Sequence, residues 1–179
     1  MRILPQNTQA LVVDIQEKLF PHISQNEELL TNCVKLIKGL KLLEIPFILN
    51  EQYPKGIGHT IPKIQELLQL NAFEKVTFSC CQTPATMEAL EKQKRKFVIV
   101  FGIEAHVCVL QSVIDLLEAG FIPVLVVDCI SSRKLSDKEV AISRMVQAGA
   151  IPTTSESLLF ELCISAKNQI FKEISQLVK

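Results

Sequence analysis

One stretch of the chain combines a reactive side chain with surroundings typical of functional sites. Cys108 follows the apolar run Phe97–Val100, which is typical of a buried strand, and lies at the start of Val107–Ala119, which has a helical pattern. Parallel sheets bind ligands at the carboxyl ends of their strands, and the field at a helix start lowers the pKa of a thiol. Cys108 is therefore a candidate nucleophile. The alternative is a small apolar core residue, which is the commoner role of a buried cysteine.

A carboxylate occupies the corresponding place after an earlier strand. Gln9–Asp14 is a short apolar run that ends in Asp14, and such runs are typical of buried parallel strands. A buried acid is costly without a partner, so we expect Asp14 in the crevice at the sheet edge, with a turn or cap role as the alternative. His106 is no partner for Cys108, because residues two apart on a helix do not face each other.

Strands and helices alternate along the chain, as the elements that position these residues. Apolar or alternating runs predict strands at 9–14, 46–50, 74–79, 97–100, 121–127 and 151–153. Helical spacing and breaker residues predict helices at 26–43, 61–70, 83–94, 107–119, 136–148, 158–163 and 166–179. This order predicts one α/β domain over residues 1–179, an open, mostly parallel, doubly wound sheet with helices on both faces. An α+β fold with some antiparallel pairing is the alternative.

The sequence also predicts where two of the helices begin and where one long loop lies. Asn26 is a candidate helix cap, and Ser136–Glu139 has the spacing of a capping box. Glu51–Thr60 is predicted to be a loop long enough to cover a site.

Composition excludes several function classes. Of the 179 residues 48% are hydrophobic and 21% charged, which indicates a globular core rather than disorder. Lysine plus arginine balances aspartate plus glutamate at 19 each, so no nucleic-acid or membrane partner is expected. The first residues lack the apolar segment of a signal peptide, and no run approaches the ~18 apolar residues of a membrane span. We therefore expect a cytoplasmic protein.

The cysteines do not form a recognisable metal or redox motif. There are six, without a C-x-x-C pair or zinc-like histidine spacing, and most are expected to fill the core. Disulfides are not expected in a cytoplasmic chain. The adjacent pair Cys80–Cys81 leaves open a thiol redox function, although adjacent cysteines bridge only with strain.

The segment Gly102–Val109 resembles the nucleophile segment of the isochorismatase-like cysteine hydrolases. Val12–Gln16 is similar to the family's aspartate segment, and Lys75–Ser79 to its lysine segment. Further matches follow in the same order, at 120–121, 147–150 and 154–156, so that the resemblance covers roughly residues 7 to 165. Within the family, Glu51–Gly58 most resembles the isochorismatase domain-containing proteins.

The resemblance implies a catalytic triad. Cys108 is the expected nucleophile, Asp14 the proton acceptor and later donor, and Lys75 the cation between them. By composition alone, Lys75 would be an ordinary surface lysine. The resemblance also implies a cis peptide bond at Ile103–Glu104 and an oxyanion hole formed by the backbone N–H groups of Glu104 and Cys108. The expected reaction is cleavage of a small amide or related carbonyl compound through a covalent acyl-enzyme.

The resemblance bears on metals and partners as well. A metal-using branch of the family has an Asp-x-His pattern where this chain reads Asn50–Gln52, and His59 stands alone. No metal or other cofactor is therefore expected. Family members commonly form homo-oligomers, which implies the same here, with the terminal helix and the Glu51–Thr60 loop as candidate contacts.

The substrate pocket and the alternative function complete the predictions. Candidate substrate-binding residues are two polar side chains that could orient a ligand and three aromatic ones that could enclose it: Gln52, Glu104, Phe20, Tyr53 and Phe78. The alternative to an enzyme is a catalytically silent binding or assembly protein that retains the fold and the pocket, since fold alone does not establish function.

Overall fold

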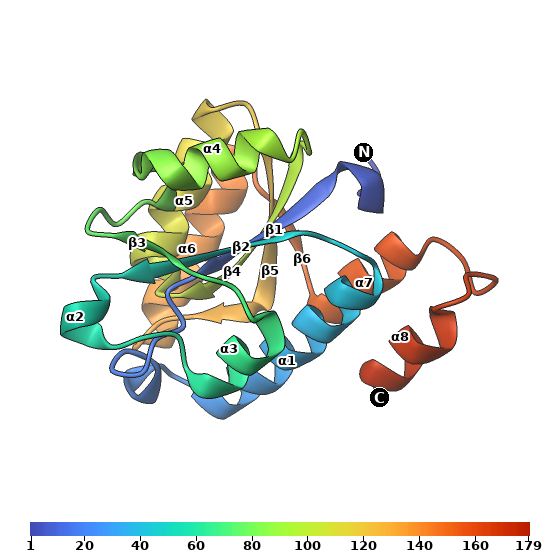
Figure 1. The fold of residues 1–179 in the computed structure, drawn as a ribbon, viewed down its shortest axis with the longest axis horizontal. Helices are drawn as coiled ribbons and strands as arrows, with labels where there is room; N and C mark the ends of the chain where they lie inside the picture. The colour runs from blue at the N-terminus through green and yellow to red at the C-terminus, as the bar shows by residue number, and fades with distance from the viewer.

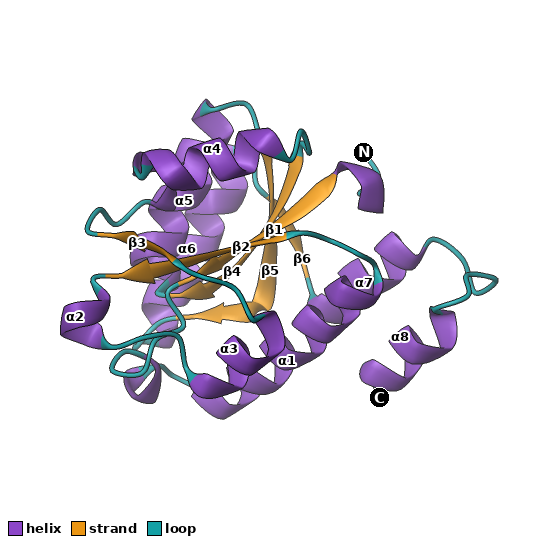
Figure 2. Ribbon diagram, viewed as in Figure 1, coloured by secondary structure: helices purple, strands orange, loops and turns teal.

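A computed structural model describes residues 1–179 and contains one six-stranded sheet that is parallel throughout (Figures 1 and 2). The strands lie in the order β3-β2-β1-β4-β5-β6. Their bounds are β1 Thr8–Val13, β2 Phe47–Gln52, β3 Phe73–Lys75, β4 Phe97–Ile103, β5 Ile122–Ser131 and β6 Ile151–Thr153. The predicted α/β class is confirmed. The α+β alternative is wrong, because the one antiparallel pairing is an isolated bridge between Gln16 and Thr60.

Helices cover both faces of the sheet, as Figure 1 shows. One face carries α1, α3, α7 and α8, and the other carries α4, α5 and α6. The bounds are α1 Asn26–Leu42, α2 Pro54–Ile57, α3 Pro62–Leu68, α4 Pro84–Lys92, α5 Leu110–Glu118, α6 Leu135–Ala148, α7 Ser155–Cys163 and α8 Phe171–Leu177. No helix combines the length and the apolar character that a membrane crossing requires.

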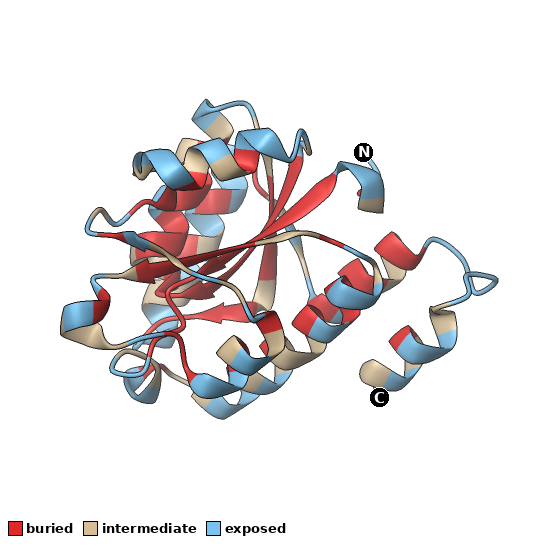
Figure 3. Ribbon diagram, in the orientation of Figure 1, coloured by how far each residue is buried: buried red, intermediate tan, exposed pale blue.

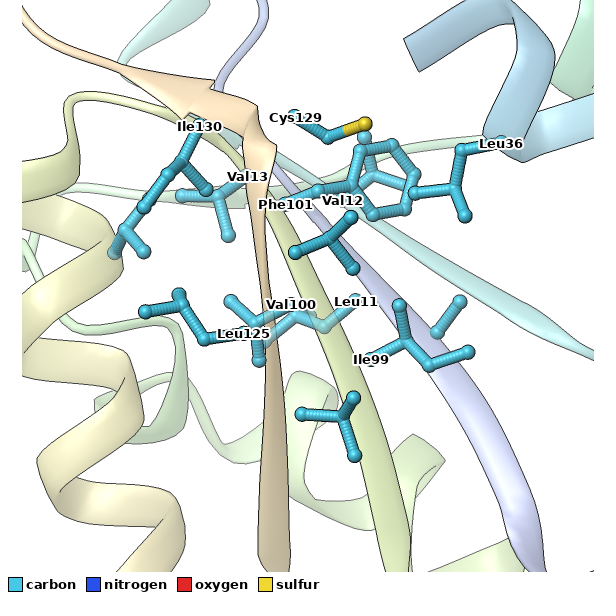
Figure 4. Packing of buried hydrophobic residues seen from close by; sticks show 14 of the residues in the cluster. Leu11, Val12, Val13, Leu36, Ile99, Val100, Phe101, Leu125, Cys129 and Ile130 are labelled. Atoms are coloured by element: carbon cyan, nitrogen blue, oxygen red, sulfur yellow. The ribbon is translucent and has the colours of Figure 1, made fainter. Parts of the chain in front are cut away.

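The core lies between the sheet and its two helical layers. Every residue of β1 and β4 is buried, which explains why both strands are nearly continuous apolar runs (Figure 3). Leu11 of β1 and Val100 of β4 are paired and lie on the same face of the sheet, and Phe101 lies near Leu36 of α1 (Figure 4). These two central strands therefore form a rigid base for whatever follows their carboxyl ends.

A single glycine lets β1 and β4 approach at that end. Gly102 has φ +125°, and a Cβ atom placed there would lie 2.0 Å from the carbonyl oxygen of Val13. The pairing between β4 and β5 shifts register between Val100 and Gly102. Gly102 thus fixes the relative position of Asp14, which follows Val13, and of the turn after β4.

Several element boundaries differ from the sequence prediction. β3 ends at Lys75 and does not continue to residue 79, because the Lys75 ammonium binds the carbonyl groups of Thr77 and Phe78 and turns the chain. Asn26 does not cap α1, because its side chain donates to the carbonyl oxygen of Phe20 instead.

The predicted capping box is also wrong, since α6 begins before Ser136, at Leu135. The predicted loop 51–60 contains the end of β2 and the single turn α2. The terminal helix is shorter than 166–179.

Candidate active site

Three reactive side chains meet at the carboxyl edge of the sheet. Asp14 follows β1, Lys75 ends β3, and Cys108 lies in a π-helical turn, Ala105–Val109, between β4 and α5. From β1 the chain first forms β2 and β3 on one side of that strand. It then crosses to the other side and forms β4, β5 and β6 there. The strand order therefore reverses direction between the neighbouring strands β1 and β4. The crevice at their carboxyl ends is the topological switch point, where α/β sheets bind ligands.

Lys75 is fully enclosed and fully hydrogen-bonded. Its side chain has 0% exposure, and Nζ donates to Asp14 Oδ2 at 2.7 Å and to Gln52 Oε1 at 2.6 Å. The carbonyl oxygens of Phe78 and Thr77 accept from the same nitrogen at 3.0 and 3.3 Å. Burial is the largest single influence and acts to lower the pKa of Lys75, but Asp14, Cys80 and Cys108 together oppose it, and the pKa is raised. Lys75 is therefore a fixed buried cation.

Asp14 offers one oxygen to Lys75 and keeps the other unbonded. The residue adopts a left-handed conformation, with φ +49°, immediately after β1. Oδ2 accepts from Lys75, whereas the buried Oδ1 has no hydrogen-bond partner within the protein. Burial raises the pKa of Asp14 above its ordinary value, and the Lys75 charge opposes this only in part. A carboxylate with a raised pKa and a vacant oxygen is well suited to accept a proton.

Cys108 is buried beside this ion pair. Burial and the Asp14 charge raise the pKa of Cys108 to about 12, against the opposing effect of Lys75. The expectation of a lowered pKa is therefore wrong. Cys108 precedes α5, which begins two residues later at Leu110, and burial is the largest influence on the pKa of the thiol. At neutral pH the thiol keeps its proton.

Gln52 and the aromatic candidates lie around Lys75. Both ends of the Gln52 amide are used within the protein, since Oε1 accepts from Lys75 and Nε2 donates to the carbonyl oxygen of Val76 at 2.9 Å. Tyr53 and Phe78 are exposed, and their backbones bond to Lys75. Phe20 is half-buried and packs against the core. The structure thus brings Gln52, Tyr53 and Phe78 to the rim of the triad.

Glu104 begins the turn that carries Cys108. The peptide bond between Ile103 and Glu104 is cis, and the Glu104 carbonyl oxygen accepts from the N–H groups of Val107 and Val109. The Glu104 side chain is buried and points to Arg133, whose backbone N and Nε both donate to Oε2 at 3.1 Å. Glu104 is therefore close to Cys108 in the chain but is held by Arg133.

The sequence reasoning missed three residues that support the site. Gln16 Oε1 accepts from the Gln52 N–H at 2.7 Å, and Gln16 Nε2 donates to the Gln52 and Gly58 carbonyl oxygens. Ser112 Oγ donates to the Cys108 carbonyl oxygen at 2.7 Å and accepts from the Cys80 N–H at 2.8 Å. Ser112 follows Cys108 by four residues, about one helical turn, and this spacing could have predicted from the sequence that the two residues are in contact. Arg133 is the third, and only the fold brings it to Glu104.

The site does not contain a metal-binding arrangement. No group of three or more histidine, cysteine, aspartate or glutamate side chains is placed to hold an ion. His59 is not isolated, because its Nδ1 lies 3.0 Å from Glu51 Oε2. The other oxygen of Glu51 accepts from the N–H and the hydroxyl group of Thr60. These contacts tie the loop after α2 to β2.

The parallel doubly wound sheet, with three buried reactive side chains at its switch point, defines an α/β protein with a candidate active site. A profile of the Isochorismatase domain matches residues 8–157. The chain is 37% identical over 179 residues to isochorismatase domain-containing protein 2 of Bos taurus, covering 99% of this chain and 86% of that protein. It is 35% identical over 183 residues to isochorismatase family protein 1B of Dictyostelium discoideum, covering 99% and 89%. This chain belongs to the isochorismatase family.

Solved structures agree with this assignment. A structure from Caenorhabditis elegans, named MAR1 ribonuclease, is 44% identical with a TM-score of 0.93, covering 99% of this chain and 92% of the other. The YcaC gene product of Escherichia coli, described as an octameric hydrolase of unknown specificity, has a TM-score of 0.92 over 99% and 89% of the two chains. At 22% identity, the YcaC likeness concerns the fold alone.

Proposed function

We propose that this chain is a cysteine hydrolase that cleaves a small amide or related carbonyl compound through Cys108, Asp14 and Lys75. One observation carries the proposal. A fully buried ammonium group lies 2.7 Å from a fully buried carboxylate, and a buried thiol lies beside both. Such an arrangement is expensive to maintain, and perturbed ionisable groups of this kind cluster at functional sites.

The raised pKa of Cys108 determines how the first step proceeds. Because the thiol is protonated at neutral pH, Asp14 Oδ1 takes the proton as Sγ attacks the carbonyl carbon. The carbonyl oxygen becomes an oxyanion, which the backbone N–H groups of Glu104 and Cys108 stabilise. Lys75 remains charged throughout and keeps Asp14 in place.

The second half of the reaction reverses the proton transfer. Asp14 returns its proton to the leaving nitrogen or oxygen as the bond to carbon breaks, which leaves a thioester on Cys108. A water molecule then attacks the thioester while Asp14 accepts its proton. The acid product leaves, and the thiol regains its proton from Asp14. No other residue or cofactor is required for these steps.

The test is a screen of small amides and carbamates with four proteins. The parent should hydrolyse at least one compound, whereas Cys108→Ala should reduce the rate below detection. Cys81→Ala is the matched control, because it removes a neighbouring thiol that has no part in the triad. Hydrolysis that survives in Cys108→Ala would contradict the covalent mechanism. Lys75→Met should also be inactive, because it leaves Asp14 buried without its cation.

One observation favours a second candidate function. The 44% identical C. elegans protein is named a ribonuclease, so RNA cleavage belongs in the same screen. A short single-stranded RNA is the probe. This chain has no excess of basic residues, which argues against strong binding to a phosphate backbone. Cleavage of RNA by the parent but not by Cys108→Ala would replace the small carbonyl substrate in our proposal.

We further propose that the protein forms a homo-oligomer. Three apolar side chains at the rim of the triad are exposed, with Val76 at 77%, Phe78 at 54% and Tyr53 at 53%. Exposed apolar groups gathered at one site favour contact with another protein surface. A second copy of this chain would cover them and close the rim.

A further inference from the structure

One buried hydroxyl group joins the turn that carries Cys108 to a segment far from it in the sequence. Ser112 lies on α5 and is fully buried. Its Oγ donates to the Cys108 carbonyl oxygen at 2.7 Å and accepts from the Cys80 N–H group at 2.8 Å. Cys80 precedes Ser112 by 32 residues, so the second contact is tertiary. A buried hydroxyl that both donates and accepts in this way fixes the two backbone groups that it joins.

The segment on the other side of this bridge encloses the Lys75 ammonium group. Nζ of Lys75 donates to the carbonyl oxygens of Thr77 and Phe78. A single 3-10 turn then begins at Cys80, and its first N–H group is the donor to Ser112. Ser112 is therefore bonded to the segment that holds the cation of the triad.

The order of the strands explains why such a bridge matters. Lys75 ends β3, whereas Cys108 lies in the turn after β4. β2 and β1 separate these two strands, so no ladder of the sheet joins β3 directly to β4. The Ser112 hydroxyl group makes a connection between the two segments above the edge of the sheet. Precise placement is important there, because a displacement of about 1 Å at a reacting group can lower a rate about a hundredfold.

We propose that Ser112 is a positioning residue, whose hydroxyl group holds the Cys108 thiol against Asp14 and Lys75. It acts through the backbone of Cys108, and so it is not a catalytic residue. The proposal goes beyond the hydrolase function and rests on it in one respect, namely that Cys108 is the nucleophile. Without the hydroxyl group, the turn that carries Cys108 is free to move away from Asp14 and toward solvent.

The test is the rate at which iodoacetamide alkylates Cys108 between pH 7 and 10, a measurement that needs no substrate. Intact mass follows labelling, and peptide mapping assigns it to Cys108. Burial and the Asp14 charge raise the pKa of this thiol, while Lys75 opposes them. In Ser112→Ala alkylation at pH 8 should be at least about tenfold faster, because each unit by which the pKa falls gives about tenfold more thiolate. The rise of the rate with pH should also become less steep toward pH 10. Ser112→Thr keeps the hydroxyl group and should keep the pH profile of the parent.

Cys80→Pro tests the same hydrogen bond from its other end. Proline has no N–H group, and Cys80 is the first residue of its turn, a position that accepts proline. This variant should be labelled like Ser112→Ala, whereas Cys80→Ala keeps the N–H group and should be labelled like the parent. Ser155→Ala is the matched control, because it also removes a buried serine hydroxyl group, one that donates to Asp128 beside α7.

Thermal unfolding of each variant distinguishes positioning from a general effect on stability. A lower melting temperature with an unchanged pH profile in Ser112→Ala would overturn the proposal, because Ser112 would then only support the fold. An altered profile in Ser155→Ala or in folded Ser112→Thr would overturn it as well. If Ser112→Ala does not fold, the comparison of Cys80→Pro with Cys80→Ala decides in the same way. The hydrolase function is decided by the Cys108→Ala screen, and no labelling result alters that screen.

Discussion

The raised pKa of Cys108 shapes the chemistry at the residue scale. A thiol with a pKa of about 12 is almost entirely protonated at neutral pH, so it differs from the activated thiolates of many cysteine enzymes. Under the proposed mechanism, deprotonation of Cys108 therefore has to accompany its attack on the substrate. Asp14 is the group whose position and vacant oxygen suit this task. The resting thiol is protected from oxidation and alkylation for the same reason.

This protonation state predicts opposite effects of one substitution on two rates. In Asp14→Asn, hydrolysis should fall by about a hundredfold or more, because the proton acceptor is lost. Alkylation of Cys108 by iodoacetamide at pH 8 should become faster, because the anion that raises the thiol pKa is gone while Lys75 remains. In the parent, alkylation should rise about tenfold per pH unit between pH 7 and 10. Intact mass at timed intervals measures labelling.

The control for this prediction is Glu118→Gln, which removes an exposed carboxylate on α5. It should change neither rate. If Asp14→Asn slowed alkylation and hydrolysis together, the thiolate would be formed by Asp14 before substrate arrives, and the concerted step would be wrong.

At the scale of elements, the sequence predicted strands and helices well but misplaced local features near the site. Apolar runs and helical spacing depend on burial, which the fold satisfies along the whole chain. β3 is shorter than its alternating pattern suggested, because the Lys75 side chain turns inward and donates hydrogen bonds to the carbonyl oxygens of Thr77 and Phe78. The π-helical turn around Cys108 has no pattern of its own in the sequence. Tertiary hydrogen bonds determine both features, and local sequence does not encode them.

Gly102 provides a sharp test of how β1 and β4 position the site. In Gly102→Ala the new methyl group would meet the Val13 carbonyl oxygen, and the backbone at φ +125° disfavours any side chain. We expect a loss of roughly 3 kcal/mol or more in the free energy of unfolding. Gly120→Ala is the control, because it has φ +82° but no atom within 4 Å, and should cost about 1 kcal/mol. Urea unfolding followed by circular dichroism measures both.

Similar losses in the two variants would contradict this account. The cost of Gly102→Ala would then come from backbone conformation alone, and the close approach of the two strands would not constrain the site.

At the scale of the whole molecule, the sequence predicted the layered fold and placed Asp14 and Cys108 at one edge of the sheet. Lys75 was identified by resemblance, since nothing in its local sequence distinguishes it from a surface lysine. Arg133 could not be predicted, because its partner Glu104 is 29 residues away in the chain. Contacts of that kind depend on how β4 and β5 are aligned, which periodicity does not reveal.

The proposed oligomer gives a prediction at this scale. Light scattering after gel filtration should give a mass that is a multiple of the monomer mass. Val76→Asp should lower it, because a charge would be buried in the interface. Val140→Asp is the control, since Val140 is also exposed but lies on α6, away from the rim. A monomeric parent, or an equal effect of the two substitutions, would contradict an interface at Tyr53, Val76 and Phe78.

The saturated ammonium group of Lys75 has a consequence for how this protein can diverge. An ammonium has three N–H groups, and four acceptors from its own chain already surround this one. Lys75 can therefore interact electrostatically with a substrate but has no N–H group left to donate to it. Under the proposed mechanism, substrate recognition depends on residues other than Lys75, so substitutions around the site can change which compound is accepted while Cys108, Asp14 and Lys75 are kept. Related chains can thus share the triad and differ in substrate.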